Sequence, residues 1–441
     1  MPNQINILNK INPFKKTIEV ASDKSLSIRA VLLASQAVGI STITNILESE
    51  DVLWAIKSIK KLGIECKKIG NQYKILGYGL NGFNIKKKTT IYAGNSGTLA
   101  RLILGLLVKT EQIVKITGDK SLSKRDFSRV IDPLKEFGIN IKSKSSSLPV
   151  EILGTEFLRP INYVETRGSA QCKSAVMLAA LNTPGITKIK AAKSRDHTER
   201  MFKHFKLPIK VKSKRKFDLI EVEGLKQFDA FNYIVPGDIS SSAFFIVLTI
   251  LSNNSKIRIK NINVNKSRVG VITILKKMKC KIGLKNRKIY KGEEIADIIV
   301  ESTKNIKGIN CPATLNSSAI DEFLVIFLVA AKAKGITNFR NLGELNKKES
   351  PRLNIAVSFL KMLGVKVERK KDDLKIFGNP RLKLTKNINI KKYLKDHRIF
   401  MFSCVAALTL NGSWLIEDKD SINTSFPNFI NILKTLGAKI N

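Results

Sequence analysis

The sequence lacks the features of a membrane or secreted protein. No uninterrupted apolar run approaches the roughly 20 residues that a membrane-spanning helix needs. Residues 1–14 contain no apolar segment of the kind found in a secretory signal. The five Cys stand singly, without a CxxC pair, which argues against a zinc site or a disulfide framework. We therefore expect a cytoplasmic protein that holds no metal.

The sequence also lacks the pattern of a nucleic-acid-binding protein, although its formal net charge is +41. Lys outnumbers Arg by more than three to one, and the Lys residues are spread evenly, as on solvated faces. Aromatic residues clustered with Arg and Lys, on which bases would stack, are missing. A basic protein of this kind still attracts small phosphorylated anions. We expect small anionic substrates, and no nucleic acid or membrane, as partners.

What the sequence does contain is a repeat. Six predicted helices end on a stop of the Leu-Lys-x-x-Gly type, with Gly (four times) or Lys (twice) at the position of a left-handed cap. These cap positions are 63, 138, 206, 279, 364 and 437. β-branched segments that predict strands lie at 39–43, 114–116, 185–189, 256–259, 335–339 and 412–416. A unit of about 70 residues buries too little apolar surface to be stable alone, so the six units must pack together.

Six units divide most simply into two domains of three units each. The segment VPGD at 235–238 combines a rigid Pro with a flexible Gly near mid-chain, and it is the expected hinge. A predicted strand at 17–20 precedes the first unit, so it can pair with either half.

Polar motifs gather where apolar helices are predicted to begin. A helix N-terminus presents unbonded N–H groups and a positive dipole, which together bind anions. Each motif alone is also compatible with an ordinary helix cap beside solvated cations. Three such helix starts in one half of the chain favour a phosphorylated ligand. They are DKSLSIR at 23–29, GNSGT at 94–98 and SAQCKS at 169–174.

Arg is informative in this chain because Lys is its default cation. Arg binds carboxylate and phosphate through two parallel hydrogen bonds, which Lys cannot do. Seven Arg lie in dense polar motifs, namely Arg29, Arg101, Arg125, Arg195, Arg268, Arg352 and Arg398. The second half adds acids beside these bases, in IDE at 320–322, KESPR at 348–352 and DHR at 396–398. Such a carboxylate can serve as a general base, although Asp321 taken alone is better explained as a helix cap.

Together these motifs resemble the 5-enolpyruvylshikimate-3-phosphate synthase family of the shikimate pathway, from residue 23 to residue 429. The resemblance rests on DKS-x-S-x-R (23–29), GN-x-GT-x-x-R (94–101), GD-x-S-L-x-x-R (118–125), SAQ-x-KS (169–174), RDHTE (195–199), PGD-x-SS (236–241), ID-E (320–322), KES-x-R (348–352) and DHRI (396–399). It implies an α/β fold, a two-domain inside-out α/β barrel with three βαβαββ units in each domain. The domains would be 21–235, and 1–20 with 236–441.

The resemblance also implies an activity, transfer of the enolpyruvyl group of phosphoenolpyruvate to the 5-hydroxyl of shikimate 3-phosphate. No cofactor is needed, and a monomer is expected. The implied catalytic residues are Asp321, Glu349 and Lys24. Those for shikimate 3-phosphate are Lys24, Ser25, Arg29, Ser169, Ala170, Gln171, Arg195, Asp321 and Lys348. Those for phosphoenolpyruvate are Lys24, Asn95, Gly97, Arg125, Gln171, Arg352 and Arg398.

The chain departs from the family pattern at a few positions. Ala21 and Ser22 replace a common Pro-Gly, and Ile28 replaces a His. Pro351 stands where Asp is usual, which removes a helix cap, and Thr424 stands where many members have a Lys that contacts phosphoenolpyruvate. Glyphosate is still expected to compete with phosphoenolpyruvate, because Gly97 keeps the space that it occupies.

Three other functions are compatible with parts of the pattern. The sister enolpyruvyl transferase of cell-wall synthesis shares the fold but uses a Cys in a mobile loop, and none of the five Cys lies in a comparable polar loop. An RNA 3′-phosphate cyclase would suit the charge but needs a nucleophilic His, which His197, His204 and His397 do not convincingly supply. A binding protein without activity would release no phosphate from the two substrates.

Overall fold

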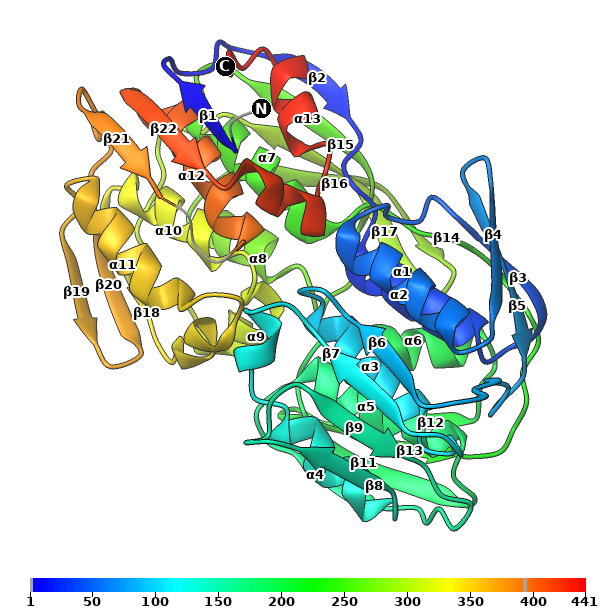
Figure 1. Ribbon diagram of the computed structural model, residues 1–441. Coiled ribbons are helices and arrows are strands. Elements are labelled where there is room, and N and C mark those ends of the chain that lie inside the picture. Colours follow the sequence, from blue (N-terminus) through cyan, green and yellow to red (C-terminus); the bar gives the residue numbers. More distant parts are fainter. Residues whose placement is uncertain (1–2, 392–394) are drawn as a thin grey trace. The chain divides into compact units, whose positions relative to one another are not determined.

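The structure is a computed structural model that describes residues 3–391 and 395–441 (Figure 1). It forms two compact units. The N-terminal unit comprises Ser22–Val235 together with Tyr290–Glu293. The C-terminal unit comprises Met1–Ala21, Pro236–Ile289 and Glu294–Asn441. The tip of one hairpin, 290–293, is therefore grouped with the N-terminal unit although the strands on either side of it belong mainly to the C-terminal unit.

The three sheets of the N-terminal unit share one pairing pattern, a parallel pair of strands extended by two antiparallel pairings. Their strand orders are β14-β3-β5-β4, β6-β7-β9-β8 and β10-β11-β13-β12. The strands are β3 (Val38–Thr44), β4 (Glu65–Ile69), β5 (Gln72–Tyr78), β6 (Thr89–Tyr92), β7 (Val114–Thr117), β8 (Asn140–Ser143), β9 (Val150–Leu153), β10 (Asn162–Glu165), β11 (Ile186–Ala192), β12 (Ile209–Ser213), β13 (Phe217–Glu223) and β14 (Asn232–Ile234).

The described residues of the C-terminal unit form sheets of order β16-β17-β15-β2, β18-β20-β19 and β1-β22-β21. The strand expected at 17–20 is found slightly earlier, as β2, and it pairs in parallel with β15 of the second half. The strands are β1 (Gln4–Ile7), β2 (Lys15–Ile18), β15 (Lys256–Asn263), β16 (Lys281–Tyr290), β17 (Glu293–Glu301), β18 (Gly335–Phe339), β19 (Val367–Lys370), β20 (Asp373–Gly378), β21 (Asn387–Ile390) and β22 (Ser413–Glu417).

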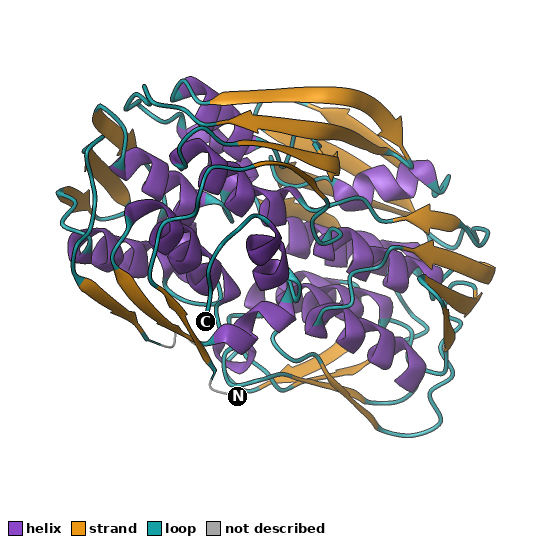
Figure 2. Ribbon diagram, turned by 90° about the horizontal axis from the view of Figure 1, so that it is seen from above, coloured by secondary structure: helices purple, strands orange, loops and turns teal. Residues whose placement is uncertain are grey.

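Helices fill the interior of each unit, and strands lie outside them (Figure 2). Six helices are buried along nearly their whole length, as expected for helices that are apolar on every face. They are α1 (Lys24–Ala34), α3 (Gly97–Leu106), α5 (Ala170–Leu181), α7 (Ile239–Leu251), α10 (Phe323–Ala331) and α12 (His397–Leu410). The others are α2 (Glu50–Lys61), α4 (Ser128–Glu136), α6 (His197–His204), α8 (Gly270–Lys277), α9 (Asn316–Ala319), α11 (Arg352–Met362) and α13 (Phe429–Thr435).

The six helix stops predicted from the sequence are confirmed. The residue at each predicted cap position has a positive φ, which is +89° at Gly63, +101° at Gly138, +78° at Gly364 and +98° at Gly437. The two Lys stops adopt the same conformation, with φ of +58° at Lys206 and +68° at Lys279. These residues follow α2, α4, α6, α8, α11 and α13, so the stops end six of the seven partly exposed helices, all but the short α9. The six predicted strands are also found, in β3, β7, β11, β15, β18 and β22.

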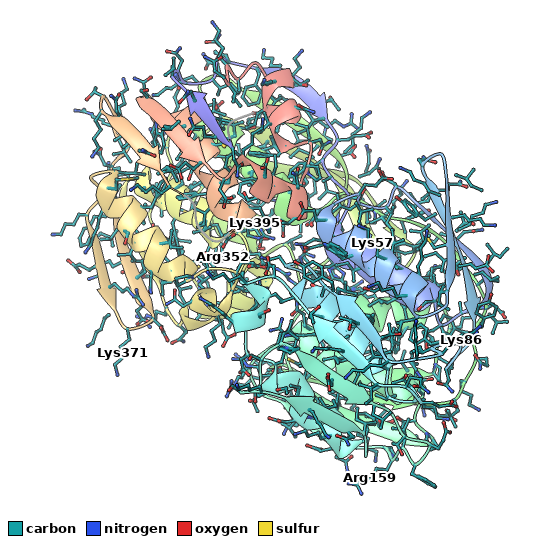
Figure 3. All side chains as sticks on the ribbon, in the orientation of Figure 1. Lys57, Lys86, Arg159, Arg352, Lys371 and Lys395 are labelled. Carbon is teal, nitrogen blue, oxygen red and sulfur yellow. The ribbon has the colours of Figure 1, made fainter. Side chains whose placement is uncertain are left out.

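Two further features bear on function. Among the described residues, no helix is both long and apolar enough to cross a membrane. Many basic side chains project outward from the ribbon, such as Lys86 and Arg159 of the N-terminal unit and Lys371 of the C-terminal unit (Figure 3). Arg352, by contrast, lies among the elements of the C-terminal unit (Figure 3), and its side chain is 1% exposed.

Candidate active site

The first motif lies at the N-terminus of α1, one of the interior helices. Asp23 caps this helix, because the backbone N–H of Leu26 donates to its Oδ1 at 2.9 Å. Lys24 is the first helical residue, and its Nζ lies 2.8 Å from Oδ2 of Asp51 on α2, with the two side chains 17% and 7% exposed. The carboxylate thus fixes a cation at the positive end of a helix, where an anion is attracted.

Arg29 lies one turn further along α1 and joins three helices. Its Nε donates to Oγ1 of Thr198 on α6 at 2.9 Å, and its Nη2 donates to Oγ of Ser174 on α5 at 3.2 Å. Its Nη1 donates to the carbonyl oxygen of Ser25 at 3.1 Å. The side chain is 5% exposed, so these bonds hold the guanidinium in one orientation beside the start of α1.

The start of α3 brings Asn95, Gly97 and Arg125 together. Asn95 accepts a hydrogen bond from Nη2 of Arg125 and donates through Nδ2 to Oδ2 of Asp119 at 2.8 Å. A Cβ at Gly97 would lie 2.8 Å from Nη1 of Arg101 and 3.0 Å from Nη1 of Arg125. Gly97 therefore leaves room for two guanidinium groups beside its backbone, and a Cβ here would make them shift.

The start of α5 carries the third motif. Ser169 caps the helix, accepting from the N–H of Cys172 at 3.3 Å, and Ala170 is the first helical residue. The amide of Gln171 is held at both ends. Its Oε1 accepts from Nη1 of Arg101 at 2.9 Å, and its Nε2 donates to Oγ1 of Thr98 at 2.9 Å. The three predicted helix starts are thus confirmed as capped N-termini of buried helices.

The predicted residues of the C-terminal unit cluster around Arg352, which begins α11. Its Nε donates to Oδ2 of Asp396 at 2.9 Å and its Nη2 to Oδ1 of the same residue at 3.2 Å. Nη1 donates to Oδ1 of Asp321 at 3.2 Å, and Nη2 also donates to Oε2 of Glu349. Burial acts to lower the pKa of the guanidinium, but the carboxylates of Asp396, Glu349 and Asp321 outweigh it and raise that pKa.

Asp321 lies among three cations and is 12% exposed. Besides Arg352, Nζ of Lys348 lies 3.5 Å from its Oδ1, and Nη2 of Arg398 lies 3.9 Å from its Oδ2. Nη1 of Arg398 donates to the backbone oxygen of Asp321 at 2.9 Å. Asp321 does not cap α10, because Glu322 occupies the cap position. The structure therefore contradicts the capping explanation of this carboxylate.

Two buried carboxylates in this unit were not assigned a role from the sequence. Asp396 caps α12, accepting from the N–H of Arg398 at 3.1 Å, besides holding Arg352. Glu322 has a fully buried side chain, and its Oε1 lies 3.9 Å from Nη1 of Arg398 and accepts from Oγ of Ser240. Glu322 directly follows the predicted Asp321, and Asp396 lies two residues before the predicted Arg398, so proximity in the sequence was the available signal.

A buried arginine extends this network behind Glu322. Nη2 of Arg268 donates to Oγ of Ser240 at 2.9 Å and to Oδ1 of Asp238 at 3.0 Å. Arg268 was singled out in the sequence, but without a role. The PGD-x-SS motif thus supports the site from within the unit instead of standing apart from it.

The substituted position Thr424 lies beside α12. Its Oγ1 donates to the backbone oxygen of Ser421 at 2.8 Å and lies 3.2 Å from Nδ1 of His397, and the side chain is buried. His397 immediately precedes Arg398. The chain thus places a hydroxyl where many family members carry a Lys.

Each unit gathers its own predicted residues. In the N-terminal unit, hydrogen bonds and close approaches link Ser25 to Arg29, Asn95 to Arg125, and Gln171 through Arg101 to Gly97. Arg195 is partly buried and directly precedes α6. In the C-terminal unit, Asp321, Lys348, Glu349, Arg352 and Arg398 form one cluster. Among the described residues, no group of three or more His, Cys, Asp or Glu side chains could hold a metal ion.

Comparison with known proteins connects this geometry to a family. A family model described as EPSP synthase (3-phosphoshikimate 1-carboxyvinyltransferase) matches residues 8–433. A protein named 3-phosphoshikimate 1-carboxyvinyltransferase from Ruthia magnifica subsp. Calyptogena magnifica is 41% identical over 436 residues, covering 99% of this chain and 98% of the relative.

Solved structures agree with the sequence relatives. The EPSP synthase of Acinetobacter baumannii superposes with a TM-score of 0.87 at 33% identity, covering 99% of each chain. The enolpyruvyl transferase NikO from Streptomyces tendae superposes with a TM-score of 0.77 at 14% identity, covering 100% of this chain and 99% of that one, which shows a shared fold alone. The two-domain α/β fold class predicted from the sequence is therefore confirmed.

Proposed function

Because the chain belongs to the EPSP synthase family, we propose that its two units divide one reaction between them, with anion binding mainly in the N-terminal unit and proton transfer in the C-terminal unit. The reaction moves the enolpyruvyl group of phosphoenolpyruvate to the 5-hydroxyl of shikimate 3-phosphate and releases phosphate. It belongs to the shikimate pathway of aromatic amino acid biosynthesis. The family predicted from the sequence motifs is confirmed.

The chemistry sets what the residues must do. The 5-hydroxyl loses its proton and attacks C2 of phosphoenolpyruvate, while C3 of the enol gains a proton. The tetrahedral intermediate then loses a proton from C3 and expels phosphate from C2, which forms the enol ether. Both substrates are polyanions, and the leaving group comes with the substrate, so no cofactor is needed.

In the N-terminal unit, we assign shikimate 3-phosphate to the starts of α1 and α5 and to the residue before α6. The groups are Lys24, Ser25, Arg29, Ser169, Ala170, Gln171 and Arg195. The bonds from Arg29 to Thr198 and Ser174 support this assignment, because a preorganised guanidinium loses little entropy on binding phosphate. We assign phosphoenolpyruvate to Lys24, Asn95, Gly97, Arg125 and Gln171, where two guanidinium groups approach the backbone of Gly97.

In the C-terminal unit, we assign proton transfer to the carboxylates around Arg352. Asp321 accepts the proton of the 5-hydroxyl, and Glu349 donates a proton to C3 with assistance from Lys24. Lys348 contributes to binding shikimate 3-phosphate, and Arg352 and Arg398 bind the carboxylate of phosphoenolpyruvate. Four of the five guanidinium N–H groups of Arg352 already donate to carboxylates. The fifth, on Nη1, is the one that we assign to the substrate.

One observation carries this proposal more than any other, the position of Asp321 beside Lys348, Arg352 and Arg398. A carboxylate held by three cations in a nearly buried site has one orientation, which a general base requires. The same cations would attract a polyanionic substrate to it. A cap or a solvated surface acid would need neither the burial nor the cations.

The structure speaks against the rival chemistries considered from the sequence. All five Cys are buried. Burial raises the pKa of the Cys172, Cys280 and Cys404 thiols among others, so none is suited to act in an exposed loop. His197 and His397 are also buried, in contact with Glu293 and Thr424. A nucleophilic His for a phosphate cyclase would need access to its substrate, which these two lack. His204 is exposed, but it lies at the C-terminal end of α6, where the helix dipole does not attract a phosphate.

We further propose that the protein acts as a monomer in the cytoplasm, with small molecules as its partners and no nucleic acid. The basic side chains that project outward from many elements (Figure 3) support small anions as partners, because such a surface attracts them.

The activity is tested by measuring phosphate release from phosphoenolpyruvate with shikimate 3-phosphate, with UDP-N-acetylglucosamine, and with no acceptor. Release that requires shikimate 3-phosphate is the expected result. Release only with the nucleotide sugar would indicate the activity of the sister enzyme. No release with either acceptor would favour a binding protein.

A further inference from the structure

The first turn of α6, His197 to Arg200, contacts other parts of the N-terminal unit through four consecutive side chains. Oγ1 of Thr198 accepts a hydrogen bond from Nε of Arg29 and lies 2.7 Å from Oγ of Ser174. Glu199 pairs with Lys173 of α5 at 2.5 Å, with the side chains 5% and 0% exposed. His197 and Arg200 contact a different element, the hairpin tip 290–293 between β16 and β17.

Glu293 makes the central contact of this tip. Its Oε1 lies 2.6 Å from Nδ1 of His197, and the two side chains are each 1% exposed. A buried carboxylate is costly unless a partner compensates it, so the pair depends on close geometry. Glu293 comes from the second half of the sequence, whereas His197 lies in the RDHTE motif of the first half.

The backbone of the same tip also lies close to α6. Nη1 of Arg200 donates to the carbonyl oxygen of Gly292 at 3.3 Å, and Nε of Arg200 donates to Oδ2 of Asp196 at 2.9 Å. Gly292 has φ of +82°, and a Cβ there would lie 3.0 Å from Cβ of His204 and 3.1 Å from the backbone oxygen of Arg200. The hairpin tip therefore contacts the helix through its backbone as well as through the Glu293 side chain.

We propose that Glu293 is a positioning residue for shikimate 3-phosphate, acting through His197. This inference rests on the proposed function, in which Arg195 and Arg29 bind that substrate. His197 lies two residues after Arg195 and directly before Thr198, which accepts a hydrogen bond from Arg29. Fixing His197 therefore fixes the helix turn between the two guanidinium groups.

Loss of Glu293 would leave the imidazole of His197 buried without this carboxylate. The first turn of α6 would shift to rehydrate or re-pair it, because a buried polar group without its partner carries a large desolvation cost. The shift would displace Arg195 and the Thr198 acceptor of Arg29. Asn95, Gly97 and Arg125, which we assign to phosphoenolpyruvate, lie at the start of α3 and in the loop after β7, so we expect them to be affected less.

The test compares Glu293→Ala and Glu293→Gln with the matched control Glu294→Ala. Glu294 follows in the same strand but pairs with Arg287, so its removal takes away a carboxylate of the same hairpin without touching α6. Calorimetric titration gives the Kd for shikimate 3-phosphate, and steady-state phosphate release gives kcat and both KM values. Thermal unfolding confirms that each variant is folded.

We expect Glu293→Ala to weaken binding of shikimate 3-phosphate about tenfold, the loss that corresponds to one unpaired buried group. The KM for phosphoenolpyruvate and kcat should change less than about twofold at saturating shikimate 3-phosphate. Glu293→Gln, which keeps one hydrogen bond to His197, should recover most of the affinity, and Glu294→Ala should match wild type.

Unchanged affinity for shikimate 3-phosphate in Glu293→Ala would overturn the inference. An equal loss of affinity for both substrates would also overturn it, since a merely structural role predicts no selectivity between them. If Glu293→Ala does not fold, Glu293→Asp decides. Asp keeps the charge but withdraws the carboxylate from Nδ1 of His197, so wild-type affinity for shikimate 3-phosphate in that variant would contradict a positioning role. A wild-type protein without phosphate release would instead contradict the proposed function itself, so the two failures are distinguishable.

Discussion

Arg352 and Asp396 form a buried ion pair closed by two hydrogen bonds, from Nε to Oδ2 at 2.9 Å and from Nη2 to Oδ1 at 3.2 Å. Asp396 also caps α12, so one carboxylate connects the starts of α11 and α12. Because both side chains are buried, neither charge is screened by water. The position of the guanidinium therefore depends on Asp396 more than on its part-exposed partner Glu349.

We predict that Asp396→Ala lowers the free energy of unfolding by about 3–5 kcal/mol, the usual loss when one member of a buried pair is removed. Ser350→Ala is the matched control, because Oγ of Ser350 donates to the same carboxylate at 2.6 Å. That change should cost only about 1 kcal/mol. Urea unfolding measures both. Equal losses would mean that the ion pair is not the dominant interaction.

Glyphosate should inhibit by competing with phosphoenolpyruvate, and Gly97→Ala should weaken the binding of both ligands. The added Cβ would meet Nη1 of Arg101 at 2.8 Å and Nη1 of Arg125 at 3.0 Å, so the guanidinium groups must move. We expect the KM for phosphoenolpyruvate and the inhibition constant to rise about tenfold or more, because a shift of about 1 Å in positioning groups can cost 100-fold. Inhibition that is independent of phosphoenolpyruvate concentration would refute this interpretation.

The helix stops give a prediction about stability alone. Lys206→Gly and Lys279→Gly should each stabilise the fold by about 0.5–1 kcal/mol, because φ is +58° and +68° at these exposed positions. The opposite change, Gly364→Ala, should destabilise by about 1 kcal/mol, since φ is +78° and nothing lies within 4 Å of the added Cβ. Chemical denaturation tests all three, and a neutral Gly364→Ala would contradict the conformational explanation.

The titration of Lys332 is expected to make the stability of the fold depend on pH. Burial, with Lys10 and Lys383 nearby, lowers the pKa of its ammonium from 10.5 to about 8. Between these values the unfolded chain binds more protons than the folded one, so this group makes stability rise with pH over that window. Its destabilising effect is fully present below about pH 8.

Lys332→Met should therefore stabilise the protein at pH 7 by about 1 kcal/mol, after allowance for solvent screening at this part-exposed site. The gain should shrink as pH rises through 8 and vanish near 10.5. Urea unfolding at several pH values measures it, with the exposed Lys86→Met as control (Figure 3). A gain that does not change with pH would rule out the titration of Lys332 as its cause.

Local signals in the sequence were sufficient for the repeat and the helix starts. Gly63 and Gly364 sit where helices must end, and β-branched runs such as 39–43 have one favourable conformation. Cap residues such as Asp23 and Ser169 are also local, since their bonds reach only three residues along the chain.

Long-range partners were not predictable in the same way. The contact between Glu293 and His197 joins residues 96 positions apart, and nothing in the hairpin sequence indicates which helix the hairpin contacts. Glu322 was read only as part of a motif, because its burial against Ser240 and Arg398 depends on how α7, α10 and α12 pack. Such contacts are determined by tertiary packing, which a single sequence does not reveal.

The most direct test of the account is the rate of phosphate release in Asp321→Asn, measured with both substrates saturating. Asn keeps the size of the side chain but cannot accept the proton of the 5-hydroxyl, so kcat should fall about 10²–10⁴-fold while the protein remains folded. A kcat within a few-fold of wild type would contradict the assignment of Asp321 as the base and, with it, the division of the reaction proposed for the two units.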